Sequence, residues 1–420
     1  MLDYVTCKCL GLSNIFDIKD YKSYYTVTRE YKVAEDFLLQ ICLPYALGSS
    51  PNTSFLALTF LTLKSNMSQQ TALLVTEFRK PLIKSTTWPI PTPGSTQLLI
   101  RVTVAALNPH DEKVRWGYFK DYFKDDLPTP IANDIVGVVD KIGSDITKFK
   151  IGDRIFTYGN FLEKDHFQNG LVQYAIADEA YTAKVPENLN EHDVATLPVN
   201  ISASAIGLFD EKYGLGLPAP WTVEAKSFDY TNTTLLIIGG GSNCGRFAVQ
   251  LAKLAGIGKI VALGGKEDEL KKWGATQVLD RHGGDEAVQS RIKSAVGDDL
   301  IYVFDAVNPG ESLYVGINAL SSTRKGTVAR LIPSSPYESA KITKKDDEYE
   351  IKDTYGIPHG QSVGKELWRN LGGYLKDGKI LPLKYEVADG VGLDAGKVNE
   401  VLDRYRDGKP VVQTHFRVSQ

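Results

Sequence analysis

The chain has 420 residues, of which 43% are apolar and 24% charged, and its net charge is −3 at pH 7. This length predicts two or three domains, and a chain of this size can bury a large core without disulfides. Nucleic acids and anionic membranes favour strongly basic surfaces, so the charge balance argues against both as partners.

Cysteine usage is the next constraint. After Cys42 the chain holds a single cysteine, Cys244. The main body is therefore neither a disulfide scaffold nor a zinc site built from several thiolates. We expect a cytoplasmic protein.

Residues 1–66 differ in character from the rest of the chain. Their two apolar runs, Phe37–Leu47 and Phe55–Leu63, are each roughly half of the about 20 residues that a membrane helix needs. A membrane hairpin is one alternative. We expect instead that the functional protein begins at or near Met67, with residues 1–66 an atypical extension, a disordered appendage or the product of a mispredicted start.

From Thr71 to about Pro186 the chain is rich in β-branched and apolar runs separated by glycine, which predicts a β-rich module. The predicted strands are Leu98–Leu107, Ile135–Gly143, Asp153–Tyr158 and Val172–Ala177.

From about Ala195 strand and helix patterns alternate, which predicts parallel β-α-β units. The predicted elements are strand Leu235–Ile238, helix Arg246–Ala255, strand Lys259–Leu263, helix Glu267–Trp273, strands Gln277–Leu279 and Leu300–Phe304, and a last strand Val411–Val418.

A glycine turn joins the first of these strands to the first helix. Such a turn points backbone N–H groups and the positive end of the helix dipole at a pyrophosphate. The strict G-x-G-x-x-G spacing fails, because serine stands at the middle glycine position, but a turn between a strand and a helix still predicts a dinucleotide site. The candidate residues are Gly239, Gly240, Gly241, Ser242, Asn243, Cys244 and Gly245.

The end of the next strand indicates which nicotinamide cofactor binds. An NAD site usually offers a carboxylate there for the ribose 2′-OH. Here the strand ends in Gly264, Gly265 and Lys266, and a lysine attracts a 2′-phosphate. NADPH is therefore the predicted cofactor, although Lys266 followed by Glu267 and Asp268 would also suit a solvated helix start.

Motifs after Met67 resemble the medium-chain dehydrogenase/reductases, in the zinc-independent branch of the quinone oxidoreductases and fungal enoyl reductases. They follow the order of that family and cover nearly everything after Met67. The segments are Ala105–Lys113 (similar to N-P-x-D-x-K), Asn133–Val139, Phe149–Ile155, Leu197–Ala203, Trp273–Asp280, Val303–Val307, Leu375–Pro382 and Asp407–Pro410.

The resemblance implies an α/β protein with a GroES-like β-barrel catalytic domain and a Rossmann domain with a doubly wound parallel sheet. We expect the barrel at residues 67–198 and 385–420 and the Rossmann domain at 199–384. In the family the active site lies between them.

Departures from the zinc enzymes of the family imply that no metal is bound. Asn108 stands where they have a cysteine ligand, and Asn133 where they have a histidine. Within the zinc-independent branch, Ala132 replaces a glycine and Ala203 replaces a threonine that contacts the nicotinamide amide. Ser202 or Ser204 is expected to take over that contact.

Hydride transfer without a Lewis acid suits acceptors with their own electron sink, namely quinones and α,β-unsaturated carbonyls. The resemblance makes Asn108 and Lys113 the candidate catalytic residues: Lys113 to stabilise an enolate, Asn108 to hold ribose or substrate. Asp111 is expected to fold the loop. Tyr118 is either a proton donor or a packed aromatic.

Other features give less information about the function. His110 and His166 form no metal-ligand spacing, Cys244 is expected to be unreactive, and the polar stretch Ser334–Gly360 is expected to include a solvated loop around its charged run.

The main hypothesis is an NADPH-dependent reductase, monomeric or homodimeric, that acts on a small-molecule substrate. One alternative is a trans-acting enoyl reductase of a fungal polyketide pathway. The other is a non-catalytic NADPH-binding protein, since fold does not fix function.

Overall fold

The computed structural model describes residues 68–123, 127–307, 310–331, 337–345 and 347–419. Residues 69–420 form one compact unit. The expectations for residues 1–66 and for a start at Met67 lie outside the described residues. No helix in the described part is long and apolar enough to cross a membrane.

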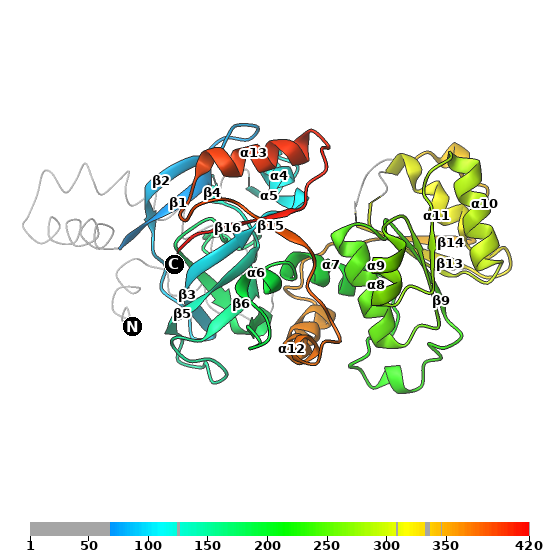
Figure 1. The fold of residues 1–420 in the computed structure, drawn as a ribbon, viewed down its shortest axis with the longest axis horizontal. Coiled ribbons are helices and arrows are strands. Elements are labelled where there is room, and N and C mark those ends of the chain that lie inside the picture. The colour runs from blue at the N-terminus through cyan, green and yellow to red at the C-terminus, as the bar shows by residue number, and fades with distance from the viewer. Residues whose placement is uncertain (1–67, 124–126, 308–309, 332–336, 346, 420) are drawn as a thin grey trace, which may run out of the picture. The chain divides into compact units, whose positions relative to one another are not determined.

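The N-terminal part is built on two sheets (Figure 1), which share the hydrophobic core with helix α13. The smaller sheet has the order β2-β1-β4 and the larger the order β15-β16-β3-β5-β6-β8, with β7 also paired to β3. The strands are β1 (Gln69–Val75), β2 (Ile83–Pro89), β3 (Gln97–Ala106), β4 (Thr129–Pro130), β5 (Asp134–Ile142), β6 (Arg154–Tyr158), β7 (Tyr174–Asp178), β8 (Thr182–Lys184), β15 (Tyr385–Val387) and β16 (Gln413–Arg417).

Strand β3 is central to this part because β5, β7 and β16 all pair with it. Eight of its ten residues are buried, which is why its sequence is almost continuously apolar. The four strands predicted here are confirmed to within two residues at either end. Pairing of β16 with β3 also brings the C-terminus of the chain back to this sheet.

Three short helices and α13 complete the N-terminal part, and helix α7 leads out of it. They are α4 (Pro109–Trp116), α5 (Lys120–Phe123), α6 (Glu191–Val194), α7 (Pro198–Phe209) and, near the C-terminus, α13 (Ala395–Arg406).

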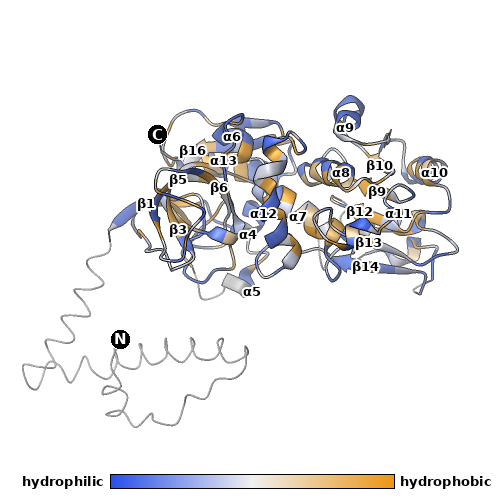
Figure 2. Cartoon of the chain, turned by 90° about the horizontal axis from the view of Figure 1, so that it is seen from below, coloured by the Kyte–Doolittle hydropathy of each residue, from blue (hydrophilic) through white to orange (hydrophobic). Residues whose placement is uncertain are grey.

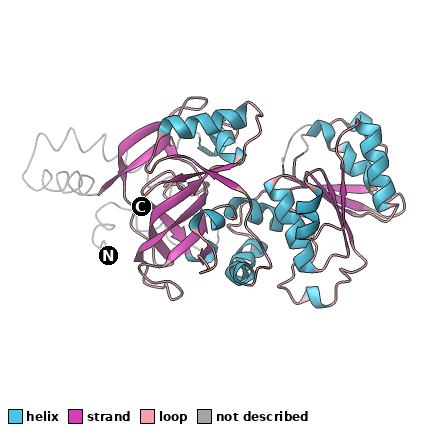
Figure 3. Cartoon of the chain, viewed as in Figure 1, coloured by secondary structure: helices cyan, strands magenta, loops and turns pink. Residues whose placement is uncertain are grey.

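The third sheet is parallel throughout, in the order β11-β10-β9-β12-β13-β14, with helices on both faces (Figures 1 and 3). Its elements are β9 (Thr234–Ile238), α8 (Asn243–Ala255), β10 (Lys259–Leu263), α9 (Glu267–Trp273), β11 (Gln277–Leu279), α10 (Asp285–Val296), β12 (Tyr302–Asp305), α11 (Tyr314–Ala319), β13 (Gly326–Arg330) and β14 (Tyr349–Asp353).

This strand order reverses between β9 and β12, as in a doubly wound dinucleotide fold, where ligands bind beyond the carboxyl ends of the strands at the reversal. Strand β9 lies at the centre, and its four last residues are buried. Helices of this part carry both hydrophilic and hydrophobic residues along their length (Figure 2), as expected for helices that cover a sheet with one face.

The segment Ser334–Gly360 was expected to include a solvated loop at its charged run, and Lys344, Lys345, Asp347 and Glu348 do lie outside any helix or strand. The same segment also contains strand β14, which the sequence reasoning missed and which pairs with β13 along five residues. Strand β14 lies at the edge of the sheet and has a neighbour on one side only. An edge strand tolerates the charged residues Glu350, Lys352 and Asp353, which conceal its pattern in the sequence.

Helix α12 (Ser362–Lys376) lies against both parts of the unit. It contacts the linking helix α7 and also β8 of the barrel sheet. Its buried residues include Leu367, Trp368 and Leu371. The domain boundaries 67–198, 199–384 and 385–420 remain a proposal.

Candidate active site

The glycine turn links β9 to α8 at the point where the strand order reverses. Gly239 has a φ of +81°, which favours glycine. At Gly245 a Cβ atom would lie 2.2 Å from the carbonyl oxygen of Gly239, so only glycine lets the helix approach the strand this closely. The first N–H groups of α8 have no partner inside the helix and point to where a pyrophosphate would bind.

Ser242 replaces a glycine without disturbing the turn. Its φ is −75°, so no glycine is needed, and its side chain accepts a hydrogen bond from the Gly245 N–H at 3.0 Å. Serine is a favoured N-cap residue because it satisfies one of the helix's unpaired donors. The G-x-G-x-x-G spacing therefore fails because its middle position holds the serine that caps helix α8.

Lys266 lies beyond the tip of β10, at the N-cap position of α9. Its side chain is exposed and makes no ion pair with the described residues, whereas the neighbouring Glu267 pairs with Lys271 at 2.7 Å. Glu269 likewise pairs with Arg246 at 3.3 Å. Two of the nearby carboxylates are thus engaged elsewhere, which leaves Lys266 available to a 2′-phosphate.

Arg281 is a residue that the sequence reasoning missed. Its Cδ atom lies 3.3 Å from where a Cβ of Gly264 would be, so its side chain lies over the end of β10. Arg281 follows β11, which is the parallel neighbour of β10. Because neighbouring parallel strands end at the same edge of a sheet, the sequence did contain this signal.

A buried network of polar side chains joins the barrel to the glycine turn. Asp134, at the start of β5, accepts hydrogen bonds from the side chains of Asn108 and Gln413, both at 2.7 Å, and from the N–H of Val199 at 2.6 Å. The amide group of Gln413 also reaches Asn243 in the turn, at 3.4 Å. The network therefore connects β5, α4, α7, β16 and α8.

Asn108 is occupied within this network. Besides its bond to Asp134, its amide oxygen accepts a hydrogen bond from Asn200 at 3.0 Å. Only 2% of the residue is exposed. Its role toward ribose or substrate stays a prediction, while its observed contacts are those of a residue that positions its neighbours.

Asp111 folds the loop, as predicted. Its carboxylate accepts hydrogen bonds from the N–H groups of Asn108 at 2.7 Å and Ala132 at 2.9 Å. Ala132 has a φ of +78°. Ala132 thus holds a left-handed backbone that favours glycine, at a cost of roughly 1 kcal/mol.

Burial raises the pKa of both Asp111 and Asp134 from 3.8 to about 7. In each case burial, which penalises the charged form, outweighs the hydrogen bonds that favour it. The electrostatic influence of Asp111 also raises the pKa of Asp134.

These shifts predict how stability depends on pH. The folded protein holds protons on Asp111 and Asp134 at pH values where the unfolded chain has released them. The contribution of these two carboxyl groups to the free energy of unfolding should therefore fall by a few kcal/mol as the pH rises from about 4 to about 7, since one pKa unit is worth about 1.4 kcal/mol, while the buried His110, whose pKa is lowered, acts in the opposite direction. Urea unfolding of the protein and of its Asp134→Asn variant across this range isolates the effect: the unsubstituted protein should lose stability relative to the variant as the pH rises, and a gain relative to the variant would contradict the assignment.

Lys113 and Cys244 are electrostatically coupled. Burial lowers the pKa of Lys113 below 10.5, and the coupling to Cys244 partly offsets this. Burial raises the pKa of the Cys244 thiol to about 12, so the thiol is protonated, in line with the expectation that it is unreactive.

Tyr118 and His110 differ in their surroundings. Tyr118 is 72% exposed, so the packed-aromatic alternative is wrong; its role as proton donor stays a prediction. His110 packs against Phe119 and Phe161 and contacts Asn133 at 3.2 Å. Burial lowers the pKa of His110 to about 4, so the ring is neutral, as expected of a structural residue.

Ser202 and Ser204 point to different neighbours. Ser202 accepts a hydrogen bond from Trp368 Nε1 at 3.2 Å, whereas the Ser204 hydroxyl reaches the carbonyl oxygen of Cys244 at 2.8 Å. The structure thus brings Ser204, and not Ser202, to the glycine turn. Ala203 packs closely against Gly356, where an added Cβ would lie 2.7 Å from the Cβ of Ala203.

No three or more His, Cys, Asp and Glu side chains of the described residues are grouped to hold a metal. The positions that match zinc ligands carry the amide side chains of Asn108 and Asn133. Asn133 donates to Asn169 at 3.1 Å and contacts His110. This set of donors does not suit zinc, which is bound by thiolate, imidazole and carboxylate groups.

Two family models match the chain. The alcohol dehydrogenase GroES-like domain matches residues 94–187, and the zinc-binding dehydrogenase model matches residues 244–331. The matches fall in family order on the barrel and, from Cys244 at the start of α8 onward, on the Rossmann part. The chain belongs to the medium-chain dehydrogenase/reductase family. As a member of it, the chain is an oxidoreductase of the nicotinamide-dependent type.

Relatives within the medium-chain family include fungal proteins. The chain is 28% identical to dehydrogenase mokE of Monascus pilosus, over 80% of this chain and 93% of the relative. It is 26% identical to the trans-enoyl reductase grgB of a Penicillium species, over 72% and 85%. The structure of a mycobacterial protein complexed with NADPH shares the fold, with a TM-score of 0.61, 19% identity and coverage of 83% and 99%.

Proposed function

We propose that the chain is a zinc-independent, NADPH-dependent reductase that transfers hydride to an activated carbonyl compound, either a quinone or an α,β-unsaturated carbonyl. The observation that supports this most is the capped glycine turn at the strand-order reversal, with Lys266 and Arg281 at the tip of β10. Zinc independence rests on the amide side chains at the ligand positions.

Each residue has a task in this proposal. Bound nicotinamide supplies the hydride. The turn from Gly239 to Gly245 binds the pyrophosphate, and Lys266 with Arg281 binds the 2′-phosphate. Gly264 keeps the end of β10 open. The ammonium of Lys113 stabilises the negative charge that develops on the substrate oxygen, which is worth most where water is excluded. Tyr118 remains the proposed proton donor.

The test is a fluorescence titration of the full-length chain with NADPH and with NADH. We expect NADPH to bind at least tenfold more tightly. Lys266→Glu should weaken NADPH binding by about 10- to 100-fold, because charge-assisted hydrogen bonds contribute about 1.5–3 kcal/mol. It should change NADH binding little.

Lys272→Glu is the matched control, since it makes the same charge change at an exposed site on the same helix and should leave both affinities within threefold. Equal affinity for the two nucleotides would overturn the choice of NADPH. If neither NADPH nor NADH binds, the reductase proposal is overturned.

A trans-acting enoyl reductase of a polyketide pathway is the second candidate, favoured by the relative named trans-enoyl reductase. Reduction of α,β-unsaturated acyl thioesters with little turnover of quinones would select it. Turnover of any of these acceptors would exclude the non-catalytic alternative.

A further inference from the structure

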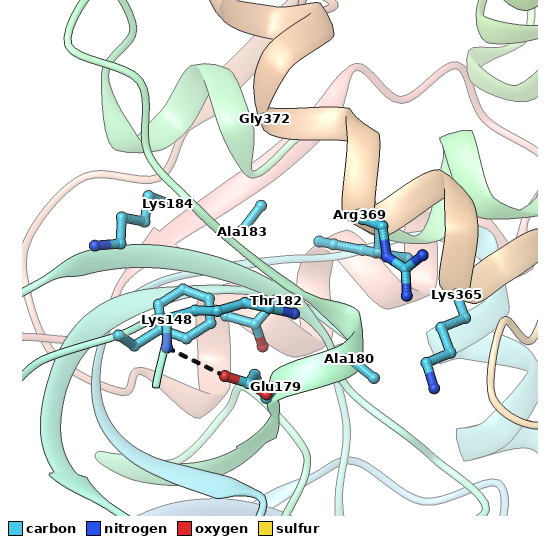
Figure 4. A pocket seen from close by; sticks show the side chains of 11 residues that line it. Lys148, Glu179, Ala180, Thr182, Ala183, Lys184, Lys365, Arg369 and Gly372 are labelled. Atoms are coloured by element: carbon cyan, nitrogen blue, oxygen red, sulfur yellow. Dashed lines mark hydrogen bonds between the residues drawn. The ribbon is translucent and has the colours of Figure 1, made fainter. Parts of the chain in front are cut away.

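A cavity of about 250 Å³ lies between the barrel and helix α12 (Figure 4). One wall comes from β8, the preceding 3₁₀ turn Glu179–Tyr181 and the loop at Lys148. The other wall comes from α12, with Lys365, Trp368 and Arg369. None of the lining residues belongs to the glycine turn or to the network around Asp134.

The rim of the cavity is cationic. Lys148 and Lys184 lie on the barrel side and Lys365 and Arg369 on the side of α12, with Glu179 as the single carboxylate of the lining (Figure 4). Glu179 accepts a hydrogen bond from the backbone N–H of Lys148 at 3.4 Å. The lining carries four positive charges against one negative charge, and a net positive charge remains when Asp153 and Glu366, which pair with two of the cations, are included, so the potential attracts anions.

The cations are not all neutralised by neighbours outside the cavity. Lys184 pairs with Asp153 at 2.8 Å, and Arg369 with Glu366 at 3.0 Å. Within the described residues, Lys148 and Lys365 make no ion pair. One cation on each wall is therefore available to a ligand.

The floor is apolar and has space to fill. Phe149, Ala183 and Trp368 are 8%, 7% and 2% exposed. On α12, a Cβ added at Gly372 would meet no atom within 4 Å. The cavity thus combines an apolar floor with a charged rim, the usual composition of a small-molecule site.

We propose that this cavity binds a small organic phosphate, with its phosphate between the two cationic walls and its apolar part over Phe149 and Trp368. A phosphate monoester carries about −1.5 to −2 charges and three acceptor oxygens at pH 7, so it serves cations on both sides, whereas a monocarboxylate offers one charge. The volume is below the roughly 300–1,000 Å³ of typical ligand sites, so we expect a ligand smaller than a whole nucleotide.

Binding there has a structural consequence, because the ligand would connect the barrel to α12. The other edge of Trp368 contacts Ser202 on the linking helix α7. The ligand should therefore raise the melting temperature of the protein.

Phenyl phosphate is the probe, added to the full-length chain saturated with NADPH so that the cofactor's own phosphate sites are filled. Isothermal titration should give a dissociation constant at least tenfold lower for phenyl phosphate than for inorganic phosphate or phenylacetate. If inorganic phosphate binds as tightly as phenyl phosphate, the apolar floor has no role in binding. If phenylacetate binds as tightly as phenyl phosphate, the site does not select phosphate.

Two neighbouring glycines of α12 provide the matched variants. Gly372→Leu fills the cavity and should weaken phenyl phosphate binding at least tenfold. Gly373→Leu also enters open space but does not line the cavity, and should change binding less than threefold. Both substitutions replace a helical glycine by a better helix former, so both variants should fold.

Lys365→Gln should also weaken binding by tenfold or more. Absence of phenyl phosphate binding by the unsubstituted protein, or equal binding by both glycine variants, would overturn the proposal. NADPH titrations of the same variants are expected to be unchanged, so the outcome is separate from that of the proposed reductase function.

Discussion

Replacing Lys113 by methionine is expected to lower kcat/KM for a quinone or an enone by 100-fold or more, with less than a threefold change in the dissociation constant of NADPH. Methionine keeps much of the side chain's length and removes its charge. Loss of one donor to a developing oxyanion typically costs 10²- to 10³-fold in kcat. Steady-state kinetics and a fluorescence titration measure the two quantities.

The location of Lys113 supports this expectation. It lies in the last turn of α4, and its charge lowers the pKa of Cys244 at the start of α8. Because burial lowers its pKa, the ammonium should be lost at a lower pH than that of an exposed lysine. Activity should therefore decline on the alkaline side, at a pH below 10.5, and the methionine variant should lack this step.

Lys120→Met is the control, because Lys120 is exposed in the short helix that follows α4. It should retain activity within twofold. Full activity of Lys113→Met, or an unchanged pH profile, would contradict a role for the Lys113 charge and leave the side chain a structural part of α4.

Local patterns allowed much of the Rossmann part to be predicted from the sequence. Strand Lys259–Leu263, helix Glu267–Trp273 and strand Gln277–Leu279 are confirmed at both ends. Each is short, bounded by glycine or a charged start, and apolar on the face that it buries. The glycine turn was predictable for the same reason, because its strand, turn and helix are consecutive in the chain.

Contacts between distant segments could not be predicted in this way. Gln413 lies 279 residues from Asp134, and nothing in the alternating pattern of the last strand indicates which of its side chains enters the barrel network. Trp368 likewise reaches Ser202 across 166 residues. Strand β14 was missed because an edge position removes the burial that makes a strand visible in the sequence.

The same network gives the largest expected effect on stability. Asp134→Leu should lower the free energy of unfolding by about 4 kcal/mol, because it removes the acceptor of three buried hydrogen bonds at once. These come from the Asn108 and Gln413 side chains and the Val199 N–H. Leaving buried donors unpaired costs about 1–3 kcal/mol for each group. Urea unfolding at pH 7 measures the change.

Asp140→Leu is the matched control, since Asp140 is exposed on the same strand, and it should change stability by about 0.5 kcal/mol or less. The cost of Asp134→Leu should also be greater at pH 5 than at pH 8. The raised pKa of Asp134 stabilises the folded protein most at low pH, and the leucine variant lacks that contribution. A smaller cost at pH 5 would mean that Asp134 stays ionised in the fold. Because the network extends through Gln413 to Asn243, the leucine variant should also bind NADPH about threefold to tenfold more weakly than the unsubstituted protein.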